Sequence, residues 1–293
     1  MARKITWTDL VDLHVHSRAS DGEYPPREVV RLAKEAGLRA VAIADHDTTA
    51  GVAEALAAGQ EFGVEVIPAV EVSTEFADGA CHLLGYFVDP ADEALEAVLC
   101  EARAGREWRN RRILERLEAL GMPLEMAEVQ RQVSSGVTTR AHFAAALLEK
   151  GHVKTWDEAF DKYLGRDKLA YVPRRRVEPA EAIRVIRGAG GLASLAHPRQ
   201  LNRPADETEE WFAHLARCGL EAVETQSPDH SAALANCYKV AAERLGLLET
   251  GGTDWHGRND SSFRLGVGGG AMRVRYEVVE RMKERLARRG NRA

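Results

Sequence analysis

Histidines and carboxylates gather in short clusters along this chain of 293 residues. The clusters hold six of its ten histidines and three carboxylates, namely His14, His16, Asp21, His46, Glu71, His82, His197, Asp254 and His256. Imidazole and carboxylate ligands together suit zinc, manganese and iron, and a site with several ligands must collect them from distant parts of a chain. The sequence therefore predicts a metal site before any other feature.

The first cluster indicates how one strand presents two imidazoles together. Side chains along a strand alternate between its faces, so His14 and His16 point one way while Val15 between them points the other. Two imidazoles on one face are placed to share a cation.

The elements that must position these ligands follow an alternating α/β pattern. Short apolar runs alternate with helical patterns, which is typical of a parallel sheet with crossover helices. We predict strands over 10–16, 40–45, 65–71, 192–197, 220–225 and 247–252, and helices over 25–37, 48–63, 179–188, 207–217, 231–245 and 276–288. Thr48 or Thr49 is expected to cap the second of these helices.

The alternation is interrupted after Glu71. Runs over 70–76 and 81–88 flank Asp78-Gly79, a hairpin turn signal, so His82 is predicted on an antiparallel or edge strand facing Glu71. From about 90 to 168 the strand pattern vanishes, and consecutive helices are predicted over 92–120, 125–132, 140–150 and 156–164. We therefore expect a barrel built from 1–89 and 169–293, with 90–168 inserted as a helical cap.

Apart from His82, the candidate ligands fall at the C-terminal end of a predicted strand or in the loop that follows it. In α/β barrels this edge carries the active site, because the loops after the strands converge there. A lone histidine in an apolar strand is more often a core residue, and that interpretation suits His82 taken alone. For the whole set it would require six independent coincidences.

Composition and charge are those of an ordinary globular enzyme. The chain is 45% hydrophobic with a formal net charge of −5, which indicates no general nucleic-acid surface and no stable DNA partner. We see no signal peptide and no membrane-spanning run, so we expect a cytoplasmic protein without a membrane partner. The four cysteines have no CxxC spacing and are interpreted as buried free thiols.

The ordered set of motifs resembles the polymerase and histidinol phosphatase (PHP) superfamily. The resemblance rests on His14-x-His16, Ser20-Asp21-Gly22, Asp45-His46-Asp47-Thr48-Thr49, Ala69-Val70-Glu71, His82, Ala196-His197-Pro198 and Gly252-Thr253-Asp254-Trp255-His256. It implies an α/β fold, a distorted (βα)7 PHP-type barrel, with a trinuclear metal site that hydrolyses phosphoesters. The helical segment resembles the insertion of a subgroup that includes nucleoside 3′,5′-bisphosphate phosphatases and a 5′-to-3′ exoribonuclease. Asp21 stands where many relatives have histidine, as in that subgroup.

Carried over position by position, the resemblance implies three metal sites. The first metal would be held by His14, His16, Glu71 and Asp254, the second by Asp21, His46 and His256, and the third by Glu71, His82 and His197. Manganese is the expected metal, with iron, zinc or magnesium as alternatives. A metal-bound hydroxide would attack phosphorus in line without a covalent phosphoenzyme. The expected substrate is a nucleoside 3′,5′-bisphosphate or the 5′ end of a short RNA.

Four residues are candidates for contact with the substrate. Arg140 begins a predicted helix, where a guanidinium and free N–H groups can hold a second phosphate, although it also fits a solvated helix end. The resemblance adds His142 and Lys168, which lie in stretches similar to those of the subgroup. His230 follows a predicted strand and is expected to contact substrate or act as a general acid, unless it is only a polar loop residue.

Two further charged groups have competing interpretations. Asp12, Asp45 and Asp47 are expected to orient metal-bound imidazoles, because such histidines donate their second N–H to a carboxylate. For Asp47, capping the following helix is an equal alternative. The arginines at 103, 106, 109, 111, 112 and 116 are interpreted as solvated charges paired with glutamates of the same helix, the alternative being a strip that tracks RNA.

Two other functional classes remain open. An amidohydrolase or deaminase also begins with His-x-His on its first barrel strand, but it normally adds a metal-bridging lysine where this chain has Glu71 and His197. A non-catalytic metal-binding module would be expected to have lost ligands, and all nine positions are filled.

Overall fold

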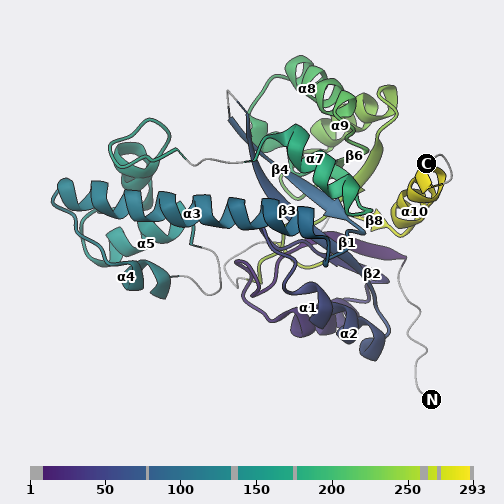
Figure 1. Ribbon diagram of the computed structural model, residues 1–293, viewed down its shortest axis with the longest axis horizontal. Coiled ribbons are helices and arrows are strands. Elements are labelled where there is room, and N and C mark those ends of the chain that lie inside the picture. The colour runs from purple at the N-terminus through teal and green to yellow at the C-terminus, as the bar shows by residue number, and fades with distance from the viewer. Residues whose placement is uncertain are drawn as a thin grey trace.

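Eight strands form one curled mixed sheet in the computed structural model (Figure 1). The structure describes residues 9–76, 79–132, 138–173, 177–257, 263–268 and 272–290. The strands are β1 (Leu10–Val15), β2 (Ala40–Ile43), β3 (Glu65–Phe76), β4 (Gly79–Tyr86), β5 (Leu192–Leu195), β6 (Ala222–Gln226), β7 (Leu248–Gly251) and β8 (Val274–Arg275). Their order in space is β7-β6-β5-β4-β3-β2-β1-β8.

The segment after β7 returns to the end of β1, so the sheet forms a near barrel. The amide of His16 donates to the carbonyl of Trp255 at 2.9 Å, and the amide of Asp254 donates to the carbonyl of His14 at 2.8 Å. Gly252 permits this approach, because a Cβ at that position would lie 2.2 Å from the Cβ of His14. Residues from opposite ends of the chain therefore meet at one place.

The strands agree with the predicted positions except around β4 and β8. Strand β3 joins the predicted strand 65–71 and the predicted run 70–76 without a break. It pairs antiparallel with β4, where His82 lies opposite Ser73. The predicted turn residue Asp78 lies outside the described residues. Strand β4 also pairs with β5, so the antiparallel prediction for His82 is confirmed and the edge alternative is wrong. The two residues of β8 are too few to show a pattern in the sequence.

One group of helices covers the outside of the sheet. Strands β1 and β2 share a core with α1 (Pro26–Glu35) and α2 (Val52–Phe62). Strands β3 to β6 share another core with α7 (Pro179–Gly188), α8 (Ala205–Arg217) and α9 (Ala232–Arg244). The last helix, α10 (Glu277–Gly290), contacts β7 and β8. Pro26 and Pro179 open α1 and α7, where the fixed φ of proline suits the first turn. Gly51 occupies the N-cap of α2, so the predicted caps Thr48 and Thr49 are wrong.

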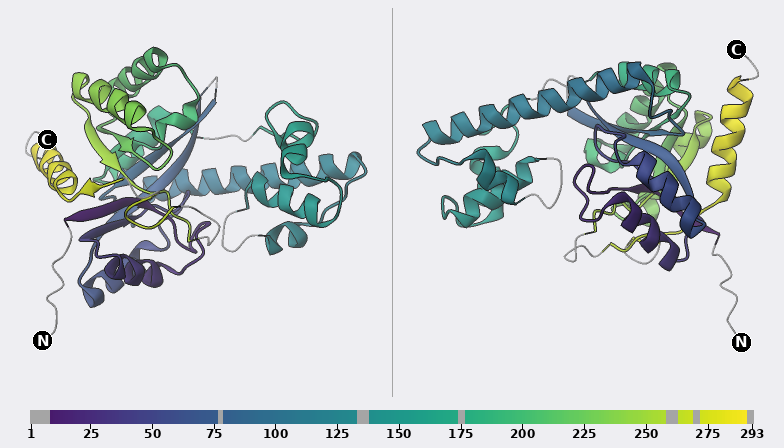
Figure 2. Two further views of the ribbon diagram at one scale, coloured as in Figure 1. Left: turned by 180° about the vertical axis from the view of Figure 1, so that it is seen from behind. Right: turned by 60° about the horizontal axis from the view of Figure 1, so that its bottom comes forward.

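A second group of helices projects from the barrel, and both views of Figure 2 show most of it standing apart from the sheet. It consists of α3 (Glu93–Ala119), α4 (Met126–Arg131), α5 (Arg140–Glu149), α6 (Trp156–Glu158) and the π-helical turn η1 (Ala159–Leu164), and the last two replace a single predicted helix. Helix α3 packs on the barrel through Leu95 and Leu99, and through Ile113 and Leu117 it joins a separate core with Phe143. A helix of 27 residues is about 40 Å long, so α3 connects the two cores as one rod. None of the described helices is long and apolar enough to cross a membrane.

Candidate metal centre and substrate cleft

All nine predicted ligands meet at one mouth of the near barrel. Three of them lie on strands: His14 on β1, Glu71 on β3 and His82 on β4. The other six lie in the segments that follow strands: His16 and Asp21 after β1, His46 after β2, His197 after β5, and Asp254 and His256 after β7. Glu71 lies at the centre, because its carboxylate oxygens are within 3.5 Å of a ring nitrogen of five histidines. The shortest of these distances, 2.8 Å, join Glu71 to Nδ1 of His46 and to Nδ1 of His82.

Two more carboxylates extend this group on the side of β7. Oδ1 of Asp254 lies 2.9 Å from Nε2 of His16, and Oδ1 of Asp21 lies 3.2 Å from Nε2 of His256. The ligand atoms form three overlapping groups, each with its atoms within 4.8 Å of one another: His16, Asp21, His46 and His256; His14, His16, Glu71 and Asp254; and His46, Glu71 and His82. Groups that share residues are suited to neighbouring ions.

Several of these ligand atoms lie within 3.6 Å of an oppositely charged group but lack the geometry of a hydrogen bond to it. They are Nε2 of His14, both ring nitrogens of His16, Nδ1 of His46 and Oε2 of Glu71. A buried polar atom without a hydrogen bond costs about 1–3 kcal/mol, so a native fold rarely collects five of them in one place unless something binds there. Divalent cations would satisfy these atoms, and the donor set therefore fits metal ions.

The electrostatics of the cluster favour bound positive charge. Burial alone would lower the pKa of His46, but the neighbouring Glu71 and Asp21 raise that pKa to about 9. Burial likewise opposes the charge on Asp21, yet His46 and His256 hold the pKa of its carboxyl well below the usual range. Burial lowers the pKa of His82 to about 4, so its imidazole is neutral at pH 7 and able to act as a ligand.

Two buried aspartates hold the loops that carry ligands. Asp12 accepts hydrogen bonds from the amide and hydroxyl of Thr253 at 2.9 and 2.6 Å, next to Asp254. Asp45 accepts from the amide and hydroxyl of Ser17 at 2.8 and 2.6 Å, in the loop after β1. Because these carboxylates fix loops, the prediction that Asp12 and Asp45 orient imidazoles is wrong.

Glu224 of β6 performs the orienting role instead. Its Oε1 accepts from Nδ1 of His14 at 3.1 Å, and its Oε2 accepts from the amide of His197 at 2.7 Å. One buried carboxylate thus fixes the ring of one ligand and the backbone of another. The signal for Glu224 in the sequence is weak, because the predicted strand 220–225 contains two glutamates, Glu221 and Glu224, and nothing local shows which one faces the site.

Arginines of α3 contact the loop that carries His46. Nη2 of Arg106 donates to Oδ2 of Asp47 at 2.8 Å, and Nη1 of Arg103 donates to the Asp47 carbonyl at 2.8 Å. Asp47 also accepts from the amide of Ser73 at 2.8 Å and has a left-handed backbone with φ of 54°. These bonds tie α3 to the loop that carries His46, and the alternative in which Asp47 caps α2 is wrong.

The interpretation of the arginine run as solvated pairs is only partly confirmed. Arg112 pairs with Glu115 on the exposed side of α3, and Arg103 pairs with Glu96 as well as with the barrel. Arg109 is buried and donates to the side chain of Asn110, contrary to the prediction. Spacing along a helix cannot distinguish these cases, because a loop from elsewhere decides which arginine is covered.

Replacing Arg106 tests this connection. The side chains of Arg106 and Asp47 are 12% and 1% exposed, so Arg106→Leu leaves a buried carboxylate without its cation. We expect the free energy of unfolding, measured by denaturant titration, to fall by about 3 kcal/mol. Arg112→Leu, which removes an exposed pair with Glu115, should lower it by less than about 1 kcal/mol. Equal losses of unfolding free energy in the two variants would show that the Arg106–Asp47 pair stabilises the protein no more than an exposed ion pair does.

A cleft lies between the cluster of candidate ligands and the projecting helices. Its central cavity, of about 300 Å³, is lined by His46 and His82 and by Arg106, Arg109 and Arg140. Ligand candidates and arginines therefore line the same space.

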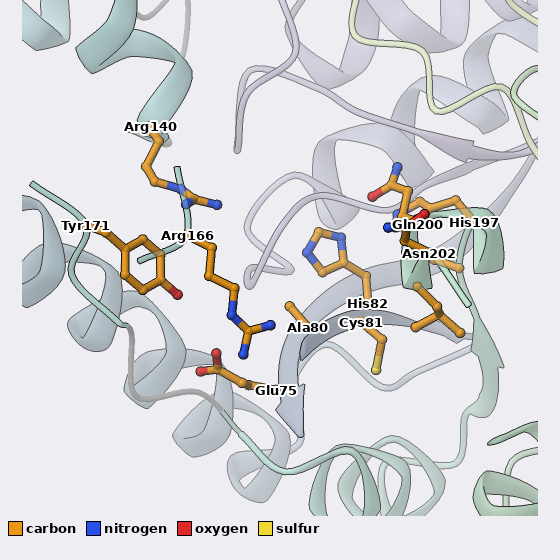
Figure 3. Close-up of a pocket in the computed structure, with 12 residues that line it drawn as sticks. Glu75, Ala80, Cys81, His82, Arg140, Arg166, Tyr171, His197, Gln200 and Asn202 are labelled. Carbon is orange, nitrogen blue, oxygen red and sulfur yellow. The ribbon is translucent and has the colours of Figure 1, made fainter. Parts of the chain in front are cut away.

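Two further cavities continue from this central cavity. One, the Arg140 arm, has about 440 Å³ and is lined by His82, His197, Arg140, Arg166, Tyr171, Gln200 and Asn202, among others. Figure 3 shows Arg140, Arg166 and Tyr171 on one side of it and His82 and Gln200 on the other. The second, the Arg111 arm, has about 420 Å³ and is lined by His46, Arg103, Arg106, Arg111, Leu114, Met126 and Gln130, among others.

Of the four predicted substrate contacts, only Arg140 lines these three cavities. Nδ1 of His142 accepts from the amide of Thr139 at 2.9 Å and so caps α5. Lys168 is exposed. Nδ1 of His230 donates to the carbonyl of Thr225 at 2.9 Å, and burial lowers the pKa of this histidine.

Comparison with known proteins identifies the family. The family model described as PHP domain matches residues 12–165, more than half of the chain. The chain belongs to the PHP domain family. It is 34% identical to a 3′,5′-nucleoside bisphosphate phosphatase of Chromobacterium violaceum, with 87% of this chain and 90% of the relative covered. A 5′-3′ exoribonuclease of Haemophilus influenzae is also 34% identical, with 85% of this chain and 90% of that protein covered.

Solved structures agree with the predicted fold class. A protein of Chromobacterium violaceum described as an amidohydrolase with bound sulfate and no metal has a TM-score of 0.79 and 33% identity, covering 88% of this chain and 90% of that one. A protein of Bifidobacterium adolescentis described as a metal-dependent phosphoesterase has a TM-score of 0.78 and 31% identity, covering 93% and 94%. The α/β barrel of the PHP type is thereby confirmed.

Proposed function

We propose that this PHP protein is a phosphoric ester hydrolase that works with metal ions bound around Glu71. The observation that carries the proposal is the buried set of ligand atoms without hydrogen bonds, next to a cavity lined by arginines. Such ligand atoms bind divalent cations, and arginine binds phosphate. Relatives named as phosphatase and exoribonuclease support the same chemistry.

The cofactors we propose are three divalent ions, with manganese as the first choice. One ion would be held by His14, His16, Glu71 and Asp254, a second by Asp21, His46 and His256, and a third by Glu71, His82 and His197. The overlapping groups of ligand atoms support the first two sets, and for the third His197 has its Nε2 3.0 Å from Glu71. When bound, the ions lower the pKa of a coordinated water and stabilise charge on the phosphoryl group. Three carboxylates cannot neutralise three divalent ions, so the loaded site attracts a phosphate dianion.

The substrate we propose is a nucleoside 3′,5′-bisphosphate or the 5′ end of a short RNA. Both carry a 5′ phosphate one nucleoside away from the phosphate that is cleaved. Arg140 is suited to that second phosphate because Nη1 is anchored on the Leu164 carbonyl at 3.0 Å and the guanidinium lies over the Tyr171 ring. Burial lowers the pKa of His230, which disfavours a role as the general acid. We propose residues 90–168 as an inserted cap that carries Arg140 over the barrel mouth.

The direct test compares adenosine 3′,5′-bisphosphate, AMP and a 5′-phosphorylated oligoribonucleotide side by side. We expect turnover of the bisphosphate or of the oligoribonucleotide to exceed that of AMP, because AMP has no second phosphate. Histidinol phosphate as the best substrate would overturn the substrate assignment. An amidohydrolase would hydrolyse none of these esters.

Replacing Arg140 tests the contact to the second phosphate. A hydrogen bond to a charged group contributes about 1.5–3 kcal/mol, so Arg140→Ala is expected to lower kcat/KM for adenosine 3′,5′-bisphosphate about 10–100-fold. For p-nitrophenyl phosphate, which has no second phosphate, the loss should be less than about threefold. Lys150→Ala, just beyond the other end of α5, serves as the control. Equal losses of kcat/KM on the two substrates would show that Arg140 does not act through the second phosphate.

A further inference from the structure

Two cavities adjoin the central cavity, each through different residues. The central cavity shares His82 and Arg140 with the Arg140 arm, and it shares His46 and Arg106 with the Arg111 arm. Because they share lining residues, the three cavities adjoin one another beside the ligand cluster. A phosphomonoester has a single ester substituent and fills only one arm, whereas a phosphodiester has two substituents and fills both.

The Arg111 arm has the size and lining of a nucleotide site. Its volume of about 420 Å³ is in the usual range for small-molecule sites, about 300–1,000 Å³. Leu114 and Met126 offer apolar contact to the face of a base, and the amide of Gln130 can bond to its edge. No sequence-specific contact is needed for such binding, because every base has a face to stack.

Arg111 and Glu107 are the charged lining residues of this arm without a partner in the described ranges, and Arg111 is the cation of the two. Arg106 is paired with Asp47, and Arg103 is bound to Glu96 and to the same loop. Arg111 is exposed and has no hydrogen bond or ion pair with any residue in the described ranges. A guanidinium in this state is available for a phosphate of a bound strand.

Building on the proposed function, we propose that the Arg111 arm is the subsite that binds the nucleotide on the far side of the cleaved phosphate. The first nucleotide lies in the Arg140 arm and the next lies in the Arg111 arm. Hydrolysis adds water across one P–O bond, with the hydroxyl joining phosphorus and a proton going to the departing ester oxygen. The arm thus distinguishes a phosphodiester strand from a bisphosphate.

The test measures kcat/KM for a 5′-phosphorylated trinucleotide and for adenosine 3′,5′-bisphosphate in each variant. Arg111→Glu places a negative charge in the arm, and Gln130→Glu does so from α4. Arg112→Glu is the matched control, because it makes the same charge change on the same helix at a residue that does not line the arm. We expect the ratio of trinucleotide to bisphosphate kcat/KM to fall about tenfold or more in the first two variants.

Salt dependence gives a second measurement. The slope of log KM for the trinucleotide against log salt should decrease by about 0.7 in Arg111→Glu, the value for one lost phosphate contact with a single strand. A ratio and a slope that are the same in Arg111→Glu and Arg112→Glu would overturn the inference while leaving bisphosphate hydrolysis intact. If the unchanged protein hydrolyses neither substrate, the proposed function fails and the inference fails with it.

Discussion

Replacing Glu71 by glutamine is expected to lower kcat/KM for adenosine 3′,5′-bisphosphate by about 10³-fold or more. Glu71 is fully buried, and its carboxylate is close to five histidine rings. Glutamine keeps the shape of the side chain but removes the charge that two overlapping ligand groups share. Metal ions contribute several kcal/mol to phosphoryl transfer, and 1.4 kcal/mol is a factor of ten in rate.

Metal content and kinetics together check this expectation. Glu71→Gln should retain fewer metal equivalents than the unchanged protein as well as less activity. Glu65→Gln is the matched control, because Glu65 is on the same strand and its carboxylate pairs with Lys283 at 2.7 Å, away from the cluster. We expect the control to keep its metal and its activity. A Glu71→Gln protein with full metal content and full turnover would remove Glu71 from the site.

Replacing Glu224 by alanine is expected to weaken metal affinity and activity about 10–100-fold. Groups that orient metal ligands have effects of this size, and Glu224 orients both the His14 ring and the His197 backbone. The two ligands would lose their orientation without losing a donor atom. Glu224→Gln retains one acceptor oxygen for two donors, so its loss should be intermediate.

Titration of metal into the depleted protein, followed by activity, separates this positioning role from a general structural one. Glu249→Ala on the adjacent strand is the control, because Glu249 is partly buried and bonded to Thr225 and Lys239 rather than to a ligand. A lower metal affinity in Glu224→Ala but not in Glu249→Ala is the expected result. Equal affinities in all variants would mean that Glu224 only supports the strand.

The sequence was sufficient for the parts of the site that follow strand ends. Chain order and strand period place His14, His46 and His197 at one edge of the sheet, and the structure brings them together there. Six of the nine candidate ligands are histidines, and histidines seldom cluster in a sequence for structural reasons alone. The clustering of histidines therefore indicates a metal site even when the fold is not known.

The interactions between distant segments cannot be predicted from the sequence in the same way. The sequence predicts that Asp12 and Asp45 orient imidazoles, yet each of them holds a loop whose path no local pattern describes. Glu224 bonds to the His14 ring from 210 positions away, and Arg106 bonds to Asp47 from 59 positions away. Periodicity gives the face of an element but not the loop that covers it, so these contacts required the tertiary structure.

The central claim is that the cluster around Glu71 is a metal centre that hydrolyses phosphoesters. Its most direct test measures bound metal and adenosine 3′,5′-bisphosphate turnover on the same preparation, before and after chelation and after manganese is added back. We expect about three metal equivalents per chain, loss of turnover with loss of metal, and recovery of turnover with manganese. Full metal content without hydrolysis of the bisphosphate or of the oligoribonucleotide, or turnover that persists after complete removal of metal, would contradict it.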